Sequence, residues 1–279
     1  MRAAAFAAFA GCFAASFAGL TACGSSGGSV EPPAQGPDAA SLPEPDPDGS
    51  FPDGDGGTDA TDAVVKPGGR FCTKLAPAPR FCDDFDDGDL TNDWTQSAVA
   101  PGALFELDTS SSTSAPASFH LISSATSVAG SNNVLLRTTM FGAVKHGTLS
   151  FSVFLPSLTF TKGAIAIAQF YVNLDDVYTL YLRGPDDAAN LPMLEAFVAG
   201  VTTRHMLTRL PPVGVWTRVA LDLDLAAGKA SVSFGADKAL DAAPISVLMG
   251  TEATVRIGAL IDGPADPFEA RFDDVTVDY

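Results

Sequence analysis

The residue types that could bind a ligand lie in two neighbouring strand-like segments, 164–172 and 177–183, and beside them. Aromatic and polar side chains are mixed there, in the set Gln169, Tyr171, Asn173, Tyr181 and Arg183. Exposed aromatic rings can stack on sugar rings while polar groups bond the hydroxyls, so this set is a candidate ligand-binding surface. Core packing is the alternative, and composition favours it, because 19 phenylalanines stand against 4 tyrosines and 2 tryptophans.

Patterns typical of catalysis are not found in the sequence. The histidines His120, His146 and His205 are scattered and have no metal-ligand spacing. Residues 69–279 contain no Gly-x-Ser-x-Gly nucleophile elbow, and the sequence contains no phosphate-binding loop and no CxxC pair. Binding is therefore favoured over catalysis, with an unrecognised enzyme site as the alternative.

Residues 1–22 are typical of a secretory signal peptide, with a positive charge at Arg2 and an uncharged apolar run over 3–20. The Leu-Thr-Ala-Cys run that ends at Cys23 resembles the lipobox of bacterial lipoproteins. The resemblance implies cleavage before Cys23, a diacylglycerol on its sulfur and a fatty acyl chain such as palmitate on its amine. It also implies anchoring in the cell envelope, at the outer membrane where there is one, because Gly24 rather than aspartate follows the cysteine. A secreted protein with a chance cysteine is the alternative.

Residues 23–68 form a predicted disordered tether after the anchor. The segment 24–68 holds 8 prolines, 9 glycines and 9 acidic residues, with few large apolar side chains. Such a composition cannot bury enough apolar surface to offset chain entropy. A partner-binding acidic tail is the less favoured interpretation.

Cys72 and Cys82 remain after Cys12 leaves with the leader and Cys23 is lipidated. They stand in two Arg-Phe-Cys runs, and an even pair in an exported protein predicts a disulfide. A metal site would need more ligands than two cysteines.

Residues 69–279 have the length of one β-sandwich domain. Period-two alternation of apolar residues recurs through them, as in 149–155 and 219–225, with turn residues between the strand-like runs. An antiparallel all-β sandwich is therefore predicted, with both tryptophans, Trp94 and Trp216, in its core. The net charge of −17 disfavours nucleic acid as a partner.

Three segments of the domain resemble the concanavalin-A-like jelly roll shared by legume lectins, laminin-G-type modules and laminarinase-type glucanases. They are Phe-Cys-Asp-Asp-Phe-Asp at 81–86, Gly-Val-Trp-Thr-Arg-Val at 214–219 and Phe-Asp-Asp-Val-Thr-Val at 272–277. The glucanases carry catalytic carboxylates in a Glu-x-Asp-x-x-Glu run, which has no counterpart here; Asp222-x-Asp224 is the nearest and lacks both glutamates. The resemblance therefore implies a fold more than an activity.

The closing segment needs a bulge at Asp273 and Asp274 if both Phe272 and Val275 are to face the core. The resemblance implies that the first and last strands are neighbours, which would gather five aspartates, Asp83, Asp84, Asp86, Asp273 and Asp274. Such a cluster could hold a structural Ca²⁺, which takes six to eight oxygens. The alternative is that these carboxylates are solvated charges on edge strands.

These observations predict a lipid-anchored envelope protein that carries a non-catalytic sandwich module for glycans or envelope polymers. A glycan-active enzyme, either a hydrolase or lyase-like, and a purely structural surface protein remain as alternatives.

Overall fold

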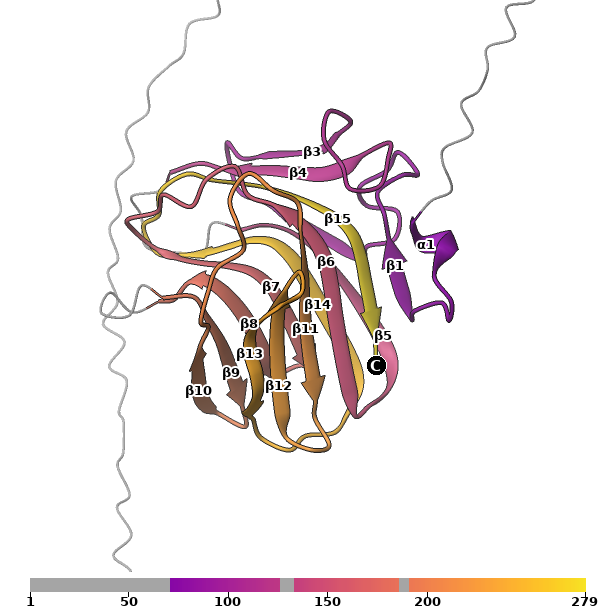
Figure 1. Cartoon of the computed structure of the whole chain (residues 1–279), viewed down its shortest axis with the longest axis vertical. Helices are drawn as coiled ribbons and strands as arrows, with labels where there is room; N and C mark the ends of the chain where they lie inside the picture. The colour runs from indigo at the N-terminus through magenta and orange to yellow at the C-terminus, as the bar shows by residue number, and fades with distance from the viewer. Residues whose placement is uncertain (1–70, 126–132, 186–190) are drawn as a thin grey trace, which may run out of the picture. The chain divides into compact units, whose positions relative to one another are not determined.

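The computed structural model describes residues 71–125, 133–185 and 191–279 (Figure 1). They belong to one compact unit. The predicted signal peptide, the lipidation site Cys23 and the tether lie outside the described residues, and the domain boundary at residue 69 stays a prediction. In the described part of the chain, helices are all too short or too polar to cross a membrane.

Almost all regular structure in the described residues is β-strand. The elements are α1 (Phe71–Lys74), β1 (Phe81–Asp83), β2 (Gln96–Val99), β3 (Leu104–Asp108), β4 (Ser118–Ser123), β5 (Val134–Val144), β6 (His146–Phe154), β7 (Ala164–Val172), β8 (Asp176–Arg183), β9 (Met193–Val198), β10 (Val201–Met206), β11 (Thr217–Asp224), β12 (Lys229–Phe234), β13 (Asp237–Pro244), β14 (Gly250–Asp262) and β15 (Phe268–Asp278).

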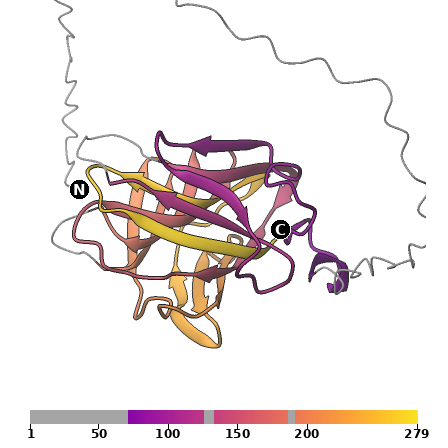
Figure 2. The ribbon, with the colours of Figure 1, turned by 90° about the horizontal axis from the view of Figure 1, so that it is seen from above.

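The strands form two antiparallel sheets. One has eight strands in the order β13-β12-β11-β6-β15-β4-β3, with β1 also paired to β15; the other has seven in the order β10-β9-β8-β7-β14-β5-β2. Figure 2 shows the yellow β15 beside the magenta β4, its partner from early in the chain. The predicted all-β sandwich is confirmed.

Alternating apolar residues explain why these segments are strands. On β11, Val219, Leu221 and Leu223 are fully buried while the residues between them are partly exposed. The inward residues of the two sheets, including Phe151 and Phe170, form one core. Burial of each such side chain contributes about 1.5–3 kcal/mol relative to exposure.

The last strand has the predicted neighbour and the predicted bulge. β1 pairs with β15, with Asp83 opposite Val275. The pairing of β15 with β6 shifts register between Asp273 and Thr276, and Asp274 adopts φ 53°. Because of this bulge, Phe272 and Val275 are both fully buried.

The predicted disulfide is confirmed. Cys72 in α1 is bonded to Cys82 in β1. Since β1 pairs with β15, the disulfide fastens the short helical turn to the eight-stranded sheet.

Candidate functional site

A row of polar side chains crosses the outward face of the seven-stranded sheet. Strand register places its members opposite one another from edge to edge: Gln96, Arg137, Arg256, Gln169, Thr179, Glu195 and Arg204. Residues that alternate with the row, such as Leu136, Phe170 and Val255, are fully buried in the core. The same pleat that fills the core therefore presents the polar row outward.

Gln169 is the centre of the row. Its Nε2 donates to Thr179 Oγ1 at 3.1 Å, and its Oε1 accepts from Tyr171 OH at 3.1 Å and from Arg256 Nη1 at 3.2 Å. The Arg256 guanidinium lies over the Tyr171 ring, 4.7 Å from its centroid. These contacts fix a tyrosine, a glutamine and an arginine as one unit with a defined geometry.

Arg137 and Arg256 stand directly opposite each other on β5 and β14. Arg137 Nη1 donates to Gln96 Oε1 at 3.0 Å, so each arginine has a neutral glutamine as its hydrogen-bond partner. Neither guanidinium forms an ion pair within the described part of the chain.

Two pockets adjoin this centre, and Arg256 lines both. A pocket of about 40 Å³ is lined by Arg137, Tyr171, Asn173, Leu174, Thr254 and Arg256. A pocket of about 190 Å³ is lined by Asn133, Ala166, Gln169, Tyr181, Arg256, Leu260, Ile261 and Asp262. The face thus offers hydroxyl, amide and guanidinium groups beside two aromatic rings.

Four of the five predicted ligand-binding residues line these two pockets: Gln169, Tyr171, Asn173 and Tyr181. Burial raises the pKa of Tyr181 to about 12, with Glu195 adding to the effect, so its hydroxyl stays protonated. Arg183 lies elsewhere, because its guanidinium donates to the carbonyls of Phe160, Thr161 and Gly163. These three hydrogen bonds fix the segment 160–163. Arg183 also lines a separate pocket of about 340 Å³.

Sequence reasoning missed Arg137 and Arg256. Each lies in a segment with strand alternation, at a position between buried residues. That alternation could have placed them on the outward face. Their pairing with each other and with Gln169 depends on sheet order.

The aspartates of β15 are buried rather than solvated. Asp273 is fully buried, and its Oδ2 accepts from the backbone N–H groups of Thr113 at 2.7 Å and Ser114 at 2.9 Å. Burial, followed by the charge of Asp274, raises the pKa of Asp273 to about 7. Asp274 Oδ1 accepts from Ser114 Oγ at 2.7 Å, and burial raises its pKa too.

The aspartates near β1 are also buried and hydrogen-bonded. Asp83 accepts from Phe85 N at 2.8 Å and from Trp94 Nε1 at 2.5 Å, and burial raises its pKa to about 6. Asp84 Oδ2 accepts from Cys72 N at 3.0 Å.

These contacts correct one interpretation and leave another open. The five aspartates are 0–8% exposed, so they are not solvated edge charges. Asp273 and Asp274 lie in the bulge of β15. Asp86, like the others, accepts from a protein donor, Ala117 N at 3.3 Å. The described residues contain no group of three or more His, Cys, Asp or Glu side chains arranged to hold a metal ion. Carboxylates directed at protein donors do not resemble a Ca²⁺ cage, and the calcium site remains a prediction.

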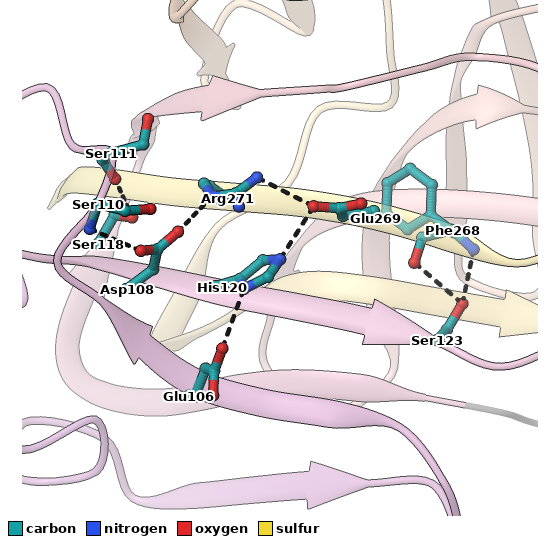
Figure 3. A network of polar contacts seen from close by, with 10 residues as sticks. All are labelled: Glu106, Asp108, Ser110, Ser111, Ser118, His120, Ser123, Phe268, Glu269 and Arg271. Carbon is teal, nitrogen blue, oxygen red and sulfur yellow. Dashed lines mark hydrogen bonds and ion pairs between the residues drawn. The ribbon is translucent and has the colours of Figure 1, made fainter.

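A second polar network lies on the outward face of the eight-stranded sheet (Figure 3). His120 is 7% exposed; its Nδ1 lies 3.3 Å from Glu106 Oε1 and its Nε2 3.1 Å from Glu269 Oε1. Arg271 continues the network to Asp108. His120 is thus a strand residue with a contact at both ring nitrogens.

The two tryptophans have different environments. Trp94 is buried in the core, as predicted, whereas Trp216 is only partly buried and does not belong to the core. Thr217 takes the inward position at the start of β11, so Trp216 faces the other way and its Nε1 donates to Ser111 Oγ at 3.2 Å. Trp216 lines a pocket of about 530 Å³ together with Arg209 and other residues of that edge.

Comparison with known proteins gives the fold and no family. No protein-family model matches the chain, and no curated protein does. The chain is similar to the solved structure of an endo-β-1,4-glucuronan lyase from the fungus Trichoderma reesei, with 14% identity, TM-score 0.53, and coverage of 72% of this chain and 95% of the lyase. It is also similar to a cellulose-induced protein, with 13% identity, TM-score 0.50, and coverage of 71% and 96%. These likenesses confirm the predicted jelly-roll sandwich.

Proposed function

We propose that this chain is a glycan-binding module whose binding surface is the polar row on the seven-stranded sheet. The supporting observation is the unit of Gln169, Tyr171 and Arg256, which lies between two pockets on a sheet face. Aromatic rings beside amide and guanidinium donors are the groups that recognise sugar rings and hydroxyls. The similar structures include a glucuronan lyase and a cellulose-induced protein, which is compatible with a carbohydrate ligand.

Binding without turnover is the first form of this proposal. Hydrolysis of a glycosidic bond needs two carboxylates that flank it. Two carboxylates lie on or beside this face, Glu195 in the polar row and Asp262 in the adjoining pocket. Glu195 already accepts a hydrogen bond from Arg204 Nε at 2.7 Å. A glycoside hydrolase therefore has little support on this face.

A lyase-like activity is the second candidate, and one observation favours it. The Tyr171 hydroxyl, a group that can transfer protons, lies within hydrogen-bond distance of Gln169 and beside Arg256. Incubation with acidic polysaccharide, monitored for an unsaturated product, separates the two forms. Accumulation of an unsaturated product would show that the chain is an enzyme and not a non-catalytic binding module.

Titration calorimetry with soluble oligosaccharides tests the proposed function. Binding is expected for wild type, and Tyr171→Ala should weaken it by about tenfold, the loss of roughly 1.4 kcal/mol of ring contact. Tyr279→Ala, which removes a tyrosine at the end of the other sheet, should leave affinity unchanged. Absence of binding to every neutral and acidic oligosaccharide tried would refute the proposal.

The lipid anchor is the second part of the proposed function. Acylation at Cys23 would hold the module at the cell envelope, since two or more acyl chains give stable membrane attachment. Metabolic labelling with palmitate should label wild type and not Cys23→Ser. An unlabelled wild-type protein that accumulates in the culture medium would disprove the anchor without affecting the glycan-binding proposal.

A further inference from the structure

Arg137 and Arg256 are two like charges at directly opposed positions of a β-sheet. Like charges in that arrangement destabilise a sheet. The chain carries a net charge of −17, and three other arginines, Arg204, Arg209 and Arg271, each lie against a carboxylate. Carboxylates are thus plentiful in this chain. Among the described residues, however, neither Arg137 nor Arg256 forms an ion pair with a carboxylate.

Both guanidinium groups keep unused donors. A guanidinium has five N–H donors, and the hydrogen bonds of Arg137 and Arg256 to Gln96 and Gln169 use one each. The Nε atoms of both arginines are buried and lack a hydrogen-bond partner within the described part of the chain. Buried donors of this kind are costly unless a ligand satisfies them.

The pocket that the two arginines share has the right chemistry for an anionic group. Tyr171, Asn173, Leu174 and Thr254 complete its lining, and no acidic side chain is among them. Its volume of about 40 Å³ suits a substituent rather than a sugar ring. The adjoining pocket of about 190 Å³, which Arg256 also lines, offers more room, with Tyr181 on its wall, but its lining includes the carboxylate of Asp262. The smaller pocket is therefore the better place for an anionic group.

We propose that Arg137 and Arg256 form an anion site that makes this face selective for acidic glycans, with a carboxylate of a uronic-acid unit held between the guanidinium groups. Arginine binds carboxylates through paired, charge-assisted hydrogen bonds. The inference rests on the proposed function, because it names the class of glycan that the polar row binds. A sulfate ester has the same charge and is the competing source of the anion.

The test compares three oligosaccharides of equal length by titration calorimetry: oligoglucuronate, neutral cello-oligosaccharide and sulfated cello-oligosaccharide. Wild type should bind oligoglucuronate most tightly. Arg137→Gln and Arg256→Gln should each weaken oligoglucuronate binding at least about tenfold, the loss of one charge-assisted interaction. Arg209→Gln, which removes the same charge from an exposed ion pair on the other sheet's edge, should change affinity less than about twofold.

The outcomes separate this inference from the proposed function. Equal affinity for neutral and acidic oligosaccharides, with binding still lost in Tyr171→Ala, would overturn the anion site alone. Tighter binding of the sulfated oligosaccharide would overturn the carboxylate assignment. Thermal melting guards against misfolding, and Arg256→Lys keeps the charge while losing the paired geometry, so its affinity for oligoglucuronate should fall between those of wild type and Arg256→Gln.

Discussion

Asp108 and Arg271 are 163 residues apart in the chain, and Arg271 Nε donates to Asp108 Oδ2 at 2.6 Å. The pair ties β3 to β15 across β4, and both side chains are largely buried, at 11% and 16% exposure. Burial by itself would raise the pKa of Asp108, but hydrogen bonds from Ser110 and Arg271 lower it to about 2.

The lowered pKa of Asp108 predicts acid sensitivity. The unfolded state takes up the proton near pH 4 and the folded state only near pH 2, so the stabilisation is present above pH 4 and is lost as pH falls between these values. Denaturant unfolding at pH 5 and pH 2.5 should show a smaller loss of stability in Asp108→Asn than in wild type. The difference should be on the order of 1 kcal/mol after allowance for solvent screening. Parallel losses in both proteins would contradict the assignment.

His120 should matter for stability because it separates two carboxylates. In His120→Ala, Glu106 and Glu269 lose the ring whose two nitrogens lie 3.3 Å and 3.1 Å from them, with an expected cost on the order of 2 kcal/mol in the free energy of unfolding. His146→Ala is the matched control, since that side chain is 50% exposed and should cost less than about 0.5 kcal/mol. Urea unfolding of both variants measures the contrast, and equal effects would show that the His120 network contributes nothing special.

Gly258 is required where β14 passes β5. Its φ is 131°, and a Cβ there would lie 2.2 Å from the Val134 carbonyl oxygen and 2.8 Å from Leu135 Cα. Gly258→Ala should therefore cost more than about 3 kcal/mol, or prevent folding, because backbone atoms cannot move aside. Gly200→Ala tests the backbone angle alone, with φ 78° and open space around it, and should cost on the order of 1 kcal/mol. Similar soluble yields and melting temperatures for both variants would disprove the steric argument.

Removal of the disulfide should destabilise the segment that holds α1 and β1, while the sandwich stays folded. A loop with a sequence separation of 10 closes between Cys72 and Cys82, for which chain entropy predicts about 3 kcal/mol or less. The double variant Cys72→Ser with Cys82→Ser should lose up to that amount in thermal or denaturant unfolding under non-reducing conditions. Free thiols at both positions, detected by mass spectrometry in protein isolated from its native host, would refute the bond.

The strands that were predictable are those with one buried face. β7 has the bounds expected from the segment 164–172, because apolar residues that must reach the core impose an alternation. The bulge in β15 was predictable for a related reason, since Phe272 and Val275 could not otherwise both be buried.

Three strands, β2, β10 and β13, had no such signal. All residues of β2 and nearly all of β10 are exposed. In β13 only Ala239 and Ala243 are buried, and Leu240 is partly buried. Each lies at the end of its sheet, where backbone pairing with one neighbour suffices. An edge strand without a buried face leaves no periodic pattern in the sequence.

Local pattern therefore determined the class of fold, the disulfide and the presence of Gln169 and Tyr171 on one strand, β7. Tertiary structure alone decided which side chains Gln169 and Tyr171 contact. Sheet order places β14 between β5 and β7, which sets Arg256 between Arg137 and Gln169. It also buries the aspartates of β1 and β15, because the strands that enclose them come from opposite ends of the domain. Contacts between strands distant in the chain leave no trace in local spacing, since only the closed sandwich brings those strands together.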